Sequence, residues 1–175
     1  MYKAALKDSV RLCIISATRN FDYQKKLWEE KWDGEKLVDG QNVSNYDTLP
    51  KVKMIMKYMT MPGTSRHHWG TDIDLNSADP DFYFTDEGDK LYKWLKTNAW
   101  KYGFCQPYIL NHAYKPFNIQ EEKWHWSYLP LAKIYLENYK AQVTYQDIKG
   151  FSGWEKAKDI DIIQNYVLDI NKNCY

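Results

Sequence analysis

Two short segments of alternating polar and apolar residues constrain the fold most, because each carries side chains that could bind a metal ion. Residues 71–75 read Thr-Asp-Ile-Asp-Leu and come soon after His67 in the run Ser-Arg-His-His-Trp-Gly. Residues 123–126 read Lys-Trp-His-Trp and directly follow Glu122. An alternation with period two predicts a β-strand in both places. A fold that brings these strands together also brings together two imidazoles and several carboxylates.

Three side chains are the candidate ligands, namely His67, Asp74 and His125. A catalytic zinc site takes three nitrogen or oxygen ligands from the protein and keeps a fourth position for water. Glu122 precedes His125 by three residues, so it is free to act as a general base toward that water. Glu121 is a second candidate for the base, but the spacing to His125 favours Glu122. The sequence therefore predicts a catalytic metal centre.

Strand geometry adds two expectations about side-chain direction. If residues 71–75 are extended, Asp72 points to the same face as Asp74. If residues 123–126 are extended, Trp124 and Trp126 share one face and His125 occupies the other. A ring flanked by two buried indoles would be held rigidly, as a metal ligand must be.

The remaining sequence predicts a mixed α and β domain. Residues 10–15, Val-Arg-Leu-Cys-Ile-Ile, form an apolar run that predicts a buried strand. Capping residues such as Thr48 and Thr85, and a glycine after the last turn such as Gly103, mark the ends of helices. The predicted helices are residues 21–33, 49–60, 86–102, 129–142 and 155–170.

Composition excludes several classes of protein. The chain has 175 residues, which is room for one domain, and its 24 basic and 23 acidic side chains give a net charge of +1. This balance argues against non-specific nucleic-acid binding. Apolar runs such as residues 12–15 are too short to cross a bilayer. The first residues lack the apolar stretch of a signal peptide, and Met1–Lys7 resembles the end of a helix, so we expect native sequence to be missing upstream.

The three cysteines, Cys13, Cys105 and Cys174, include no Cys-x-x-Cys pair. Neither a thiolate zinc site nor a disulfide scaffold is therefore expected. One disulfide with one free thiol stays open, so the cysteines do not decide the cellular compartment.

The ligand pattern resembles a known family. Ser-x-His-x-x-Gly-x-x-x-Asp at residues 65–74, followed by Glu-x-Trp-His at residues 122–125, resembles the zinc D-alanyl-D-alanine carboxypeptidases of the VanY type. That family includes L,D-carboxypeptidases that act on peptidoglycan stem peptides. Residues 16–24, Ser-Ala-Thr-Arg-Asn-Phe-Asp-Tyr-Gln, are similar to the family's Ser-x-x-Arg-Ser-x-x-x-Gln segment. The three pieces keep the family's order and span residues 10–128, whereas residues after about 140 match nothing in it.

The resemblance implies a small α+β domain whose antiparallel sheet is flanked by helices, a fold shared with the hedgehog signalling domain. Residues 1–175 would form a single zinc peptidase domain, with residues 140–175 as a helical extension packed on it. The implied site residues are His67, Asp74 and His125 for one Zn²⁺, Glu122 as catalytic base, Arg19 as a catalytic and substrate-binding cation, and Ser65 and Gln24 as further substrate-binding residues. An arginine suits the free carboxylate that a carboxypeptidase must recognise.

The resemblance also implies a partner and a place. The partner would be a peptidoglycan stem peptide, with no nucleic acid and no membrane span, and the protein is expected to be a monomer. Because peptidoglycan lies outside the cytoplasmic membrane, the implied location is the cell envelope, either periplasmic or secreted.

Two positions depart from the family pattern. Asp72 stands where the family usually has a small apolar residue, and Lys123 stands where relatives often have proline. The extra carboxylate of Asp72 could pair with Arg66 or Arg19. It could also hydrogen-bond to a metal ligand and so change the properties of the metal. His68 is expected to face away from the metal, and His112 is expected in a loop that could line the cleft.

Three functions are compatible with this pattern. The first is removal of the terminal D-alanine from stem peptides that end in D-Ala-D-Ala. The second keeps the same site and changes the substrate, as an L,D-carboxypeptidase or a peptidoglycan endopeptidase. The third is a non-catalytic, metal-stabilised binding module. The presence of Glu122 and Arg19 argues against the third, because a pure binder needs no base.

Overall fold

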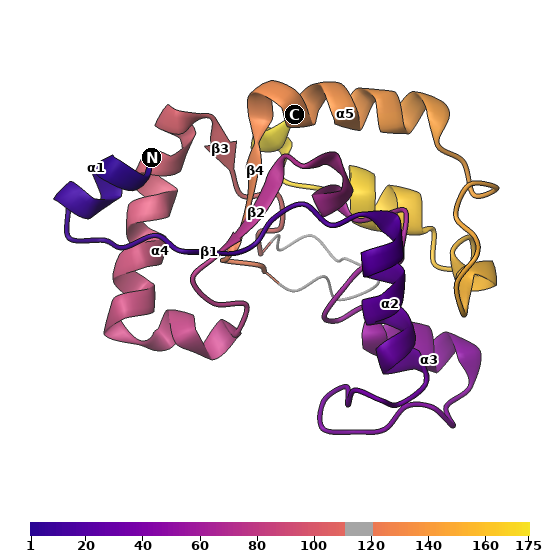
Figure 1. The fold of residues 1–175 in the computed structure, drawn as a ribbon. Helices are drawn as coiled ribbons and strands as arrows, with labels where there is room; N and C mark the ends of the chain where they lie inside the picture. Colours follow the sequence, from indigo (N-terminus) through magenta and orange to yellow (C-terminus); the bar gives the residue numbers. More distant parts are fainter. Residues whose placement is uncertain (111–120) are drawn as a thin grey trace.

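A four-stranded antiparallel sheet forms the centre of the computed structural model, which describes residues 1–110 and 121–175 (Figure 1). The strand order is β1–β2–β4–β3, and each neighbouring pair runs antiparallel. The strands are β1 (Ile14–Ser16), β2 (Asp72–Leu75), β3 (Phe104–Cys105) and β4 (His125–Tyr128). The small antiparallel sheet with helices around it confirms the predicted α+β class.

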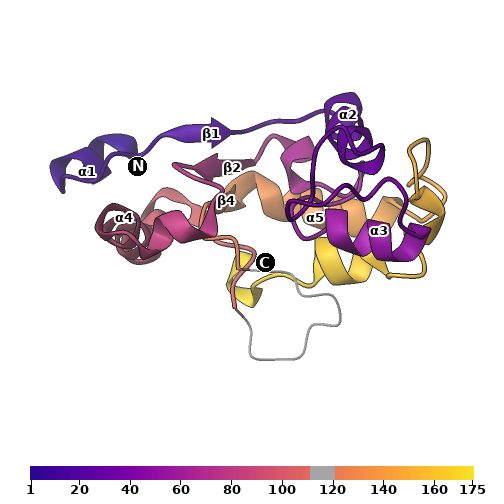
Figure 2. The ribbon, with the colours of Figure 1, turned by 90° about the horizontal axis from the view of Figure 1, so that it is seen from below.

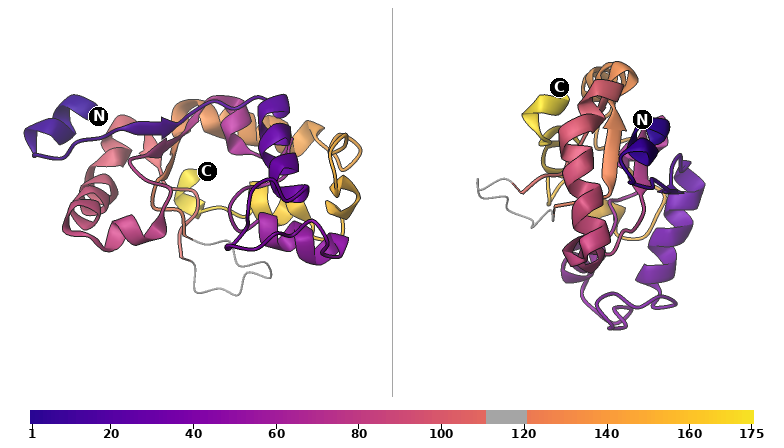
Figure 3. Two further views of the ribbon diagram at one scale, coloured as in Figure 1. Left: turned by 60° about the horizontal axis from the view of Figure 1, so that its bottom comes forward. Right: turned by 90° about the vertical axis from the view of Figure 1, so that its left-hand side faces the viewer.

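Helices surround the sheet (Figure 1). The α-helices are α1 (Tyr2–Lys7), α2 (Phe21–Trp32), α3 (Thr48–Ile55), α4 (Asp86–Asn98) and α5 (Leu129–Gln142). Short 3₁₀-helices span Arg66–Trp69, Pro80–Phe84, Ala99–Tyr102, Trp154–Lys156 and Lys172–Cys174, and a π-helix spans Ile163–Leu168. Figures 2 and 3 show α1 and α4 at one end of the molecule and α2 and α3 at the other. Among residues 1–110 and 121–175, no helix has the length and apolar character needed to cross a membrane.

Three clusters of buried apolar side chains hold these elements together. The first packs α2 and α3 against residues 148–166, the second packs α1 and α4 against β2 and β4, and the third packs α5 against residues 167–174. Representative members are, in the same order, Trp28, Ile55 and Ile160; Ala5, Leu95 and Trp126; and Leu136, Val167 and Cys174. The last quarter of the chain therefore contributes to two of the three clusters.

The local sequence predicted the ends of helices correctly where a helix has clear capping residues. Thr85 Oγ1 accepts a hydrogen bond from the Gly88 N–H at 3.1 Å, which caps α4 as predicted. The predicted helix of residues 86–102 continues past Asn98 as a tighter 3₁₀ turn and ends at Gly103, whose φ is +81°. The bounds predicted for residues 129–142 are those of α5.

The prediction for residues 10–15 was wrong in extent and in burial. The strand is confined to Ile14–Ser16, and Ile14 is 60% exposed because β1 lies at the edge of the sheet. Val10 and Leu12 are buried, but they precede the strand. The helix predicted at residues 49–60 ends at Ile55, and Thr48 is its first residue rather than its N-cap.

Two further segments differ from their predictions. The strand predicted at residues 123–126 begins only at His125, because the His125 N–H donates to the Glu122 carbonyl at 3.2 Å and closes a turn first. Trp124 and Trp126 nevertheless pack in the same core cluster. Residues 155–170 do not form one helix, since Asp161 has a φ of +46° that interrupts helical geometry.

A disulfide joins the sheet to the end of the chain. Cys105 in β3 is bonded to Cys174, 69 residues away, with their Cα atoms 5.6 Å apart. Cys13 is free and exposed. The chain therefore has the one disulfide and one free thiol that its composition left open.

We expect the disulfide to contribute substantially to stability, because it closes a long loop in the unfolded chain. The Cys105→Ser/Cys174→Ser double variant should lose about 2–4 kcal/mol of unfolding free energy. Urea denaturation followed by circular dichroism measures this loss, and Cys13→Ser provides a control that removes a thiol without removing the bond. Equal urea midpoints for the double variant and the control would contradict the expectation.

Candidate active site

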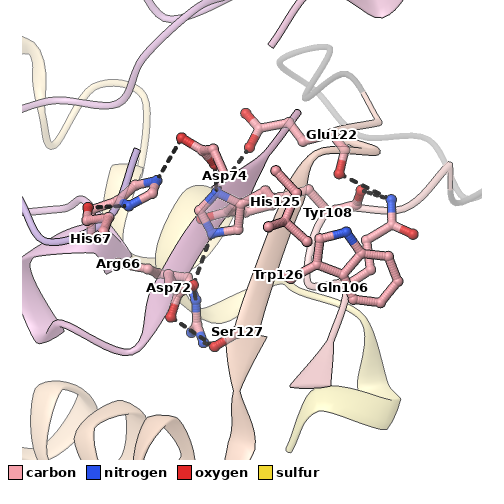
Figure 4. Close-up of polar contacts among 12 residues, drawn as sticks. Arg66, His67, Asp72, Asp74, Gln106, Tyr108, Glu122, His125, Trp126 and Ser127 are labelled. Atoms are coloured by element: carbon pink, nitrogen blue, oxygen red, sulfur yellow. Dashed lines mark hydrogen bonds and ion pairs between the residues drawn. The ribbon is translucent and has the colours of Figure 1, made fainter. Parts of the chain in front are cut away.

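The pairing of β2 with β4 brings two of the predicted ligands together. Asp74 lies directly opposite His125 in the antiparallel register, and Asp74 Oδ1 is 3.1 Å from His125 Nδ1. His67 approaches from the short helix Arg66–Trp69, with its Nε2 3.2 Å from Asp74 Oδ2 (Figure 4). All three side chains are buried, and one ligand atom from each lies within 4.8 Å of the others.

The spacing between His67 and Asp74 has a local structural reason. The helix Arg66–Trp69 ends at Gly70, whose φ of +70° is a left-handed conformation that side chains disfavour. A Cβ at this position would also lie 3.3 Å from Thr18 Oγ1. The turn at Gly70 directs the chain into β2, so that Asp74 returns to face the imidazole of His67.

Hydrogen bonds hold both imidazoles in fixed orientations. His67 Nδ1–H donates to the Ala17 carbonyl at 2.8 Å, which leaves Nε2 as the lone-pair nitrogen facing Asp74. His125 Nε2–H donates to Asp72 Oδ2 at 2.8 Å, which leaves Nδ1 facing Asp74 and Glu122. Outer partners of this kind are what orient histidine ligands in metal sites.

Two buried atoms of this cluster lack a hydrogen-bond partner among the described residues. They are His67 Nε2 and Asp74 Oδ1, and both face the space between the three side chains. Buried polar atoms are normally satisfied, so a pair of unsatisfied lone-pair atoms points to a missing bond. Two nitrogens and one carboxylate oxygen are a donor set that zinc takes in catalytic sites. The residues present therefore fit a zinc ion.

The charges around the three candidate ligands favour ionised carboxylates. Burial disfavours the charged form of Asp74, but the two neighbouring imidazoles outweigh it and hold the pKa of Asp74 well below its usual range. Burial also opposes charge on His125, yet the carboxylates of Asp72 and Asp74 raise the pKa of His125 to about 10. A metal ion at Nδ1 therefore has to displace a proton there, so metal binding should release protons.

Glu122 lies at the turn before β4 and faces the same space. Its Oε2 is 3.3 Å from His125 Nδ1, and its side chain is 28% exposed. Burial raises the pKa of the Glu122 carboxyl to about 7, the range in which a carboxyl can both take and give a proton near neutral pH. The rival Glu121 is directed elsewhere, because its Oε1 lies 2.8 Å from the Tyr92 hydroxyl.

Asp72 lies behind His125 in a fully buried polar network. Its Oδ2 accepts from Arg66 Nε at 2.9 Å as well as from His125, and its Oδ1 accepts from the hydroxyls of Thr71 and Ser127, each at 2.7 Å. Arg66, rather than Arg19, is therefore the cation that pairs with Asp72. Opposing the effect of burial, His125 and Arg66 hold the pKa of Asp72 well below its usual range.

Arg19 lies in the loop after β1, and His68 anchors that loop. The Arg19 N–H donates to the His67 carbonyl at 3.2 Å, and the Arg19 carbonyl accepts from His68 Nδ1–H at 2.6 Å. His68 Nε2 in turn accepts from the Gly63 N–H at 3.0 Å. His68, which was expected to face away from the metal, therefore holds the loop that carries the candidate site residue Arg19. Its adjacency to His67 was the only sequence signal for this role.

One cleft of about 410 Å³ contains the cluster. Its lining includes all the predicted site residues except Asp72, namely Arg19, Gln24, Ser65, His67, Asp74, Glu122 and His125. Arg19 Nε and Gln24 Oε1 are buried without a hydrogen-bond partner among the described residues, whereas Gln24 Nε2 donates to the Thr60 carbonyl at 2.8 Å. Tyr108 and Tyr166 also line the cleft, and no motif in the sequence marks them. His112 lies outside the described residues.

Comparison with known proteins identifies the family of this chain. The family model described as VanY, D-alanyl-D-alanine carboxypeptidase, matches residues 1–131, about three-quarters of the chain. The chain belongs to the VanY family. The match ends near the start of α5, so residues 132–175, which include Cys174 and Tyr166, lie beyond the VanY match.

Individual relatives share a minority of residues with this VanY family member. A D-alanyl-D-alanine carboxypeptidase of Enterococcus faecalis is 25% identical over 138 residues, which is 77% of this chain and 47% of that protein. The chain spans less than half the length of the curated relatives it matches first.

Two solved structures are similar in fold. A mutant of the vancomycin resistance D,D-pentapeptidase VanY, in complex with Zn(II), has a TM-score of 0.55 and 24% identity, covering 73% of this chain and 65% of that chain. The LdcB LD-carboxypeptidase has a TM-score of 0.55 and 25% identity, covering 82% of this chain and 64% of that chain. The fold around the cluster is therefore that of VanY-type peptidases.

Proposed function

We propose that this chain is a zinc-dependent carboxypeptidase that removes the terminal D-alanine from peptidoglycan stem peptides. The observation that carries the proposal is the buried cluster of His67, Asp74 and His125 with Glu122 beside it. Its unsatisfied lone-pair atoms face the same space as the Glu122 carboxyl. Membership of the VanY family and the Zn(II) complex of a structural neighbour support the same reading.

His67 Nε2, His125 Nδ1 and an oxygen of Asp74 would hold one Zn²⁺. When bound, zinc supplies a water activated at neutral pH and polarises the scissile carbonyl. Asp72 fixes the ring of His125 through Nε2–H, and the Ala17 carbonyl fixes the ring of His67 through Nδ1–H. Both rings are therefore held in position, and His125 Nδ1 would offer its lone pair to the metal once it has lost its proton.

Glu122 carries the proton in the proposed reaction. Its Oε2 accepts a proton from the attacking water and then donates it to the nitrogen of the leaving D-alanine. A carboxyl whose pKa is raised toward neutrality by burial is suited to both halves of this transfer. The amide bond breaks between the carbonyl carbon and that nitrogen, and the water oxygen becomes part of the new carboxylate.

Recognition of the substrate is assigned to three other residues that line the cleft, Arg19, Gln24 and Ser65. The guanidinium of Arg19, with its Nε unsatisfied, can pair with the free terminal carboxylate of the substrate. Gln24 Oε1 is an unsatisfied acceptor for a substrate amide N–H. Ser65 precedes His67 by two residues and also lines the cleft. These contacts would place the last peptide bond of the substrate over Glu122.

A location in the cell envelope agrees with the covalent structure. Disulfides persist in oxidising compartments and are rare in the cytosol, and Cys105 is bonded to Cys174. Peptidoglycan, the proposed substrate, lies in such a compartment.

The decisive experiment is a comparison of two defined muropeptides with zinc-loaded protein. One ends in D-Ala-D-Ala, and the other ends in an L,D bond between a diamino acid and D-alanine. We expect mass spectrometry to show loss of one alanine from the first. Loss from the second alone would reassign the chain as an L,D-carboxypeptidase, the activity named for the LdcB neighbour. Loss from neither, with zinc bound, would contradict the proposal and favour an endopeptidase or a binding module.

A further inference from the structure

A buried amide outside the metal cluster holds the backbone of Glu122. Gln106 follows β3 and is only 6% exposed. Its Nε2 donates to the Glu122 carbonyl at 3.1 Å and to the Tyr108 carbonyl at 3.2 Å (Figure 4). The Glu122 N–H also donates to the Tyr108 carbonyl at 3.1 Å. The side chain of Gln106 therefore ties together two backbone segments that are 14 residues apart.

The other end of the Gln106 amide is fixed as well. Its Oε1 lies 3.0 Å from the hydroxyl of Tyr92, which also lies 2.8 Å from Glu121 Oε1. Both ends of the amide therefore have defined partners, so the orientation of Gln106 is set by its surroundings. A side chain held in this way can transmit its own position to the backbone that it contacts.

The last residues of the chain hold the segment that carries Gln106. Asn171 Nδ2 donates to the Gln106 carbonyl at 3.0 Å, and the Asn171 N–H donates to the Pro107 carbonyl at 2.8 Å. Cys174 is covalently bonded to Cys105, which directly precedes Gln106. The C-terminal segment thus contacts three consecutive residues, 105–107, and it lies beyond the part of the chain that matches the VanY family.

We propose that Gln106 is a positioning residue for Glu122, and that residues 171–174 act as its brace. This inference rests on the proposed function, in which Glu122 is the base. The carboxyl of Glu122 has no hydrogen bond to a neighbouring side chain other than its approach to His125, among the contacts of the described residues. Its position therefore depends on the backbone, and Gln106 and Tyr108 determine where that backbone lies. Displacements of about 1 Å in a catalytic group can cost 100-fold in rate.

The first test replaces Gln106 by leucine, which keeps the approximate size and removes the amide. We expect kcat to fall by about 10–100-fold while KM and the zinc dissociation constant stay within about twofold, because the hydrogen bonds of Gln106 include none to the candidate ligands or to Arg19 among the described residues. Asn98→Leu is the matched control, since Asn98 Nδ2 likewise donates to a backbone carbonyl, that of Trp94, but in α4. A variant with wild-type kcat, or one whose zinc affinity falls as much as its kcat, would overturn the inference.

Asn171→Ala tests the brace and does not depend on Gln106→Leu being folded. Loss of its bonds to the Gln106 and Pro107 carbonyls should lower kcat by about 3–10-fold, again with KM and zinc affinity unchanged. An unchanged kcat in Asn171→Ala would contradict the proposed role of residues 171–174 in holding Gln106.

A double-mutant cycle separates this inference from the function on which it rests. If Gln106 acts through Glu122, Gln106→Leu should produce no further loss of turnover in a Glu122→Gln background. An equal further loss in that background would show that Gln106 acts elsewhere. If Glu122→Gln by itself keeps full turnover, the proposed base is wrong, whatever Gln106→Leu does.

Discussion

Replacement of Glu122 by glutamine is expected to lower kcat by about 10²–10⁴-fold, the usual contribution of a general base. Glutamine has nearly the same shape but cannot accept the proton of the attacking water. Since Glu122 is not among the three proposed ligands, the zinc dissociation constant should change little. Release of D-alanine under single-turnover conditions, with zinc affinity measured by chelator competition, tests both expectations.

Glu121→Gln is the control for this experiment. Glu121 lies next to the proposed base in sequence, but its carboxylate faces the Tyr92 hydroxyl rather than the cluster. We expect it to keep kcat within about twofold, because the new amide oxygen can still accept from Tyr92. Similar losses in the Glu121 and Glu122 variants would mean that the turn, and not the base, limits the rate.

The pH profile should follow the ionisation of Glu122. The base must be deprotonated at the start of the reaction, so kcat/KM is expected to fall as pH falls through the pKa of the Glu122 carboxyl. Burial raises that pKa to about 7 in the metal-free protein. A bound divalent cation favours the carboxylate, so the fall in the zinc enzyme should begin below pH 7. The acid limb should be absent from the residual activity of Glu122→Gln.

Replacement of Asp72 by alanine should have the largest effect on stability. The change leaves Arg66 buried without its carboxylate, and breaking a buried ion pair by removing one partner costs about 3–5 kcal/mol. The ring of His125 also loses the acceptor for its Nε2–H, so zinc affinity should fall by about 10–100-fold. Urea unfolding of metal-free protein measures the first effect, and zinc competition measures the second.

A second substitution separates the two roles of Asp72. Adding Arg66→Met to Asp72→Ala removes the unpaired buried cation, so a large part of the lost stability should return. Zinc affinity should stay low in the double variant, because the partner of His125 is still missing. If the double variant loses as much stability as the Asp72→Ala and Arg66→Met variants lose together, Arg66 and Asp72 are not coupled.

The sequence by itself determined those features that depend on a few neighbouring residues. The alternation in residues 71–75 predicted a strand, and the structure has β2 at Asp72–Leu75. The Thr85 cap and the bounds of α5 were likewise readable, because caps and helical periodicity act within one or two turns. The pairing of β2 with β4 was expected, because the two strands carry candidate ligands of one metal ion.

Only the tertiary structure decided features that depend on distant partners. The sequence left two arginines as possible partners of Asp72. Asp72 pairs with Arg66, because β2 packs against the helix Arg66–Trp69. The bond of Cys105 with Cys174 spans 69 residues, and the contact of Gln106 with the Glu122 carbonyl spans 16. The exposure of Ile14 follows from its place at the sheet edge, and residues 155–170 do not form one helix because the chain is interrupted at Asp161. Local propensity carries no information about which residues become neighbours across the fold, because that choice is made by the burial of the whole chain.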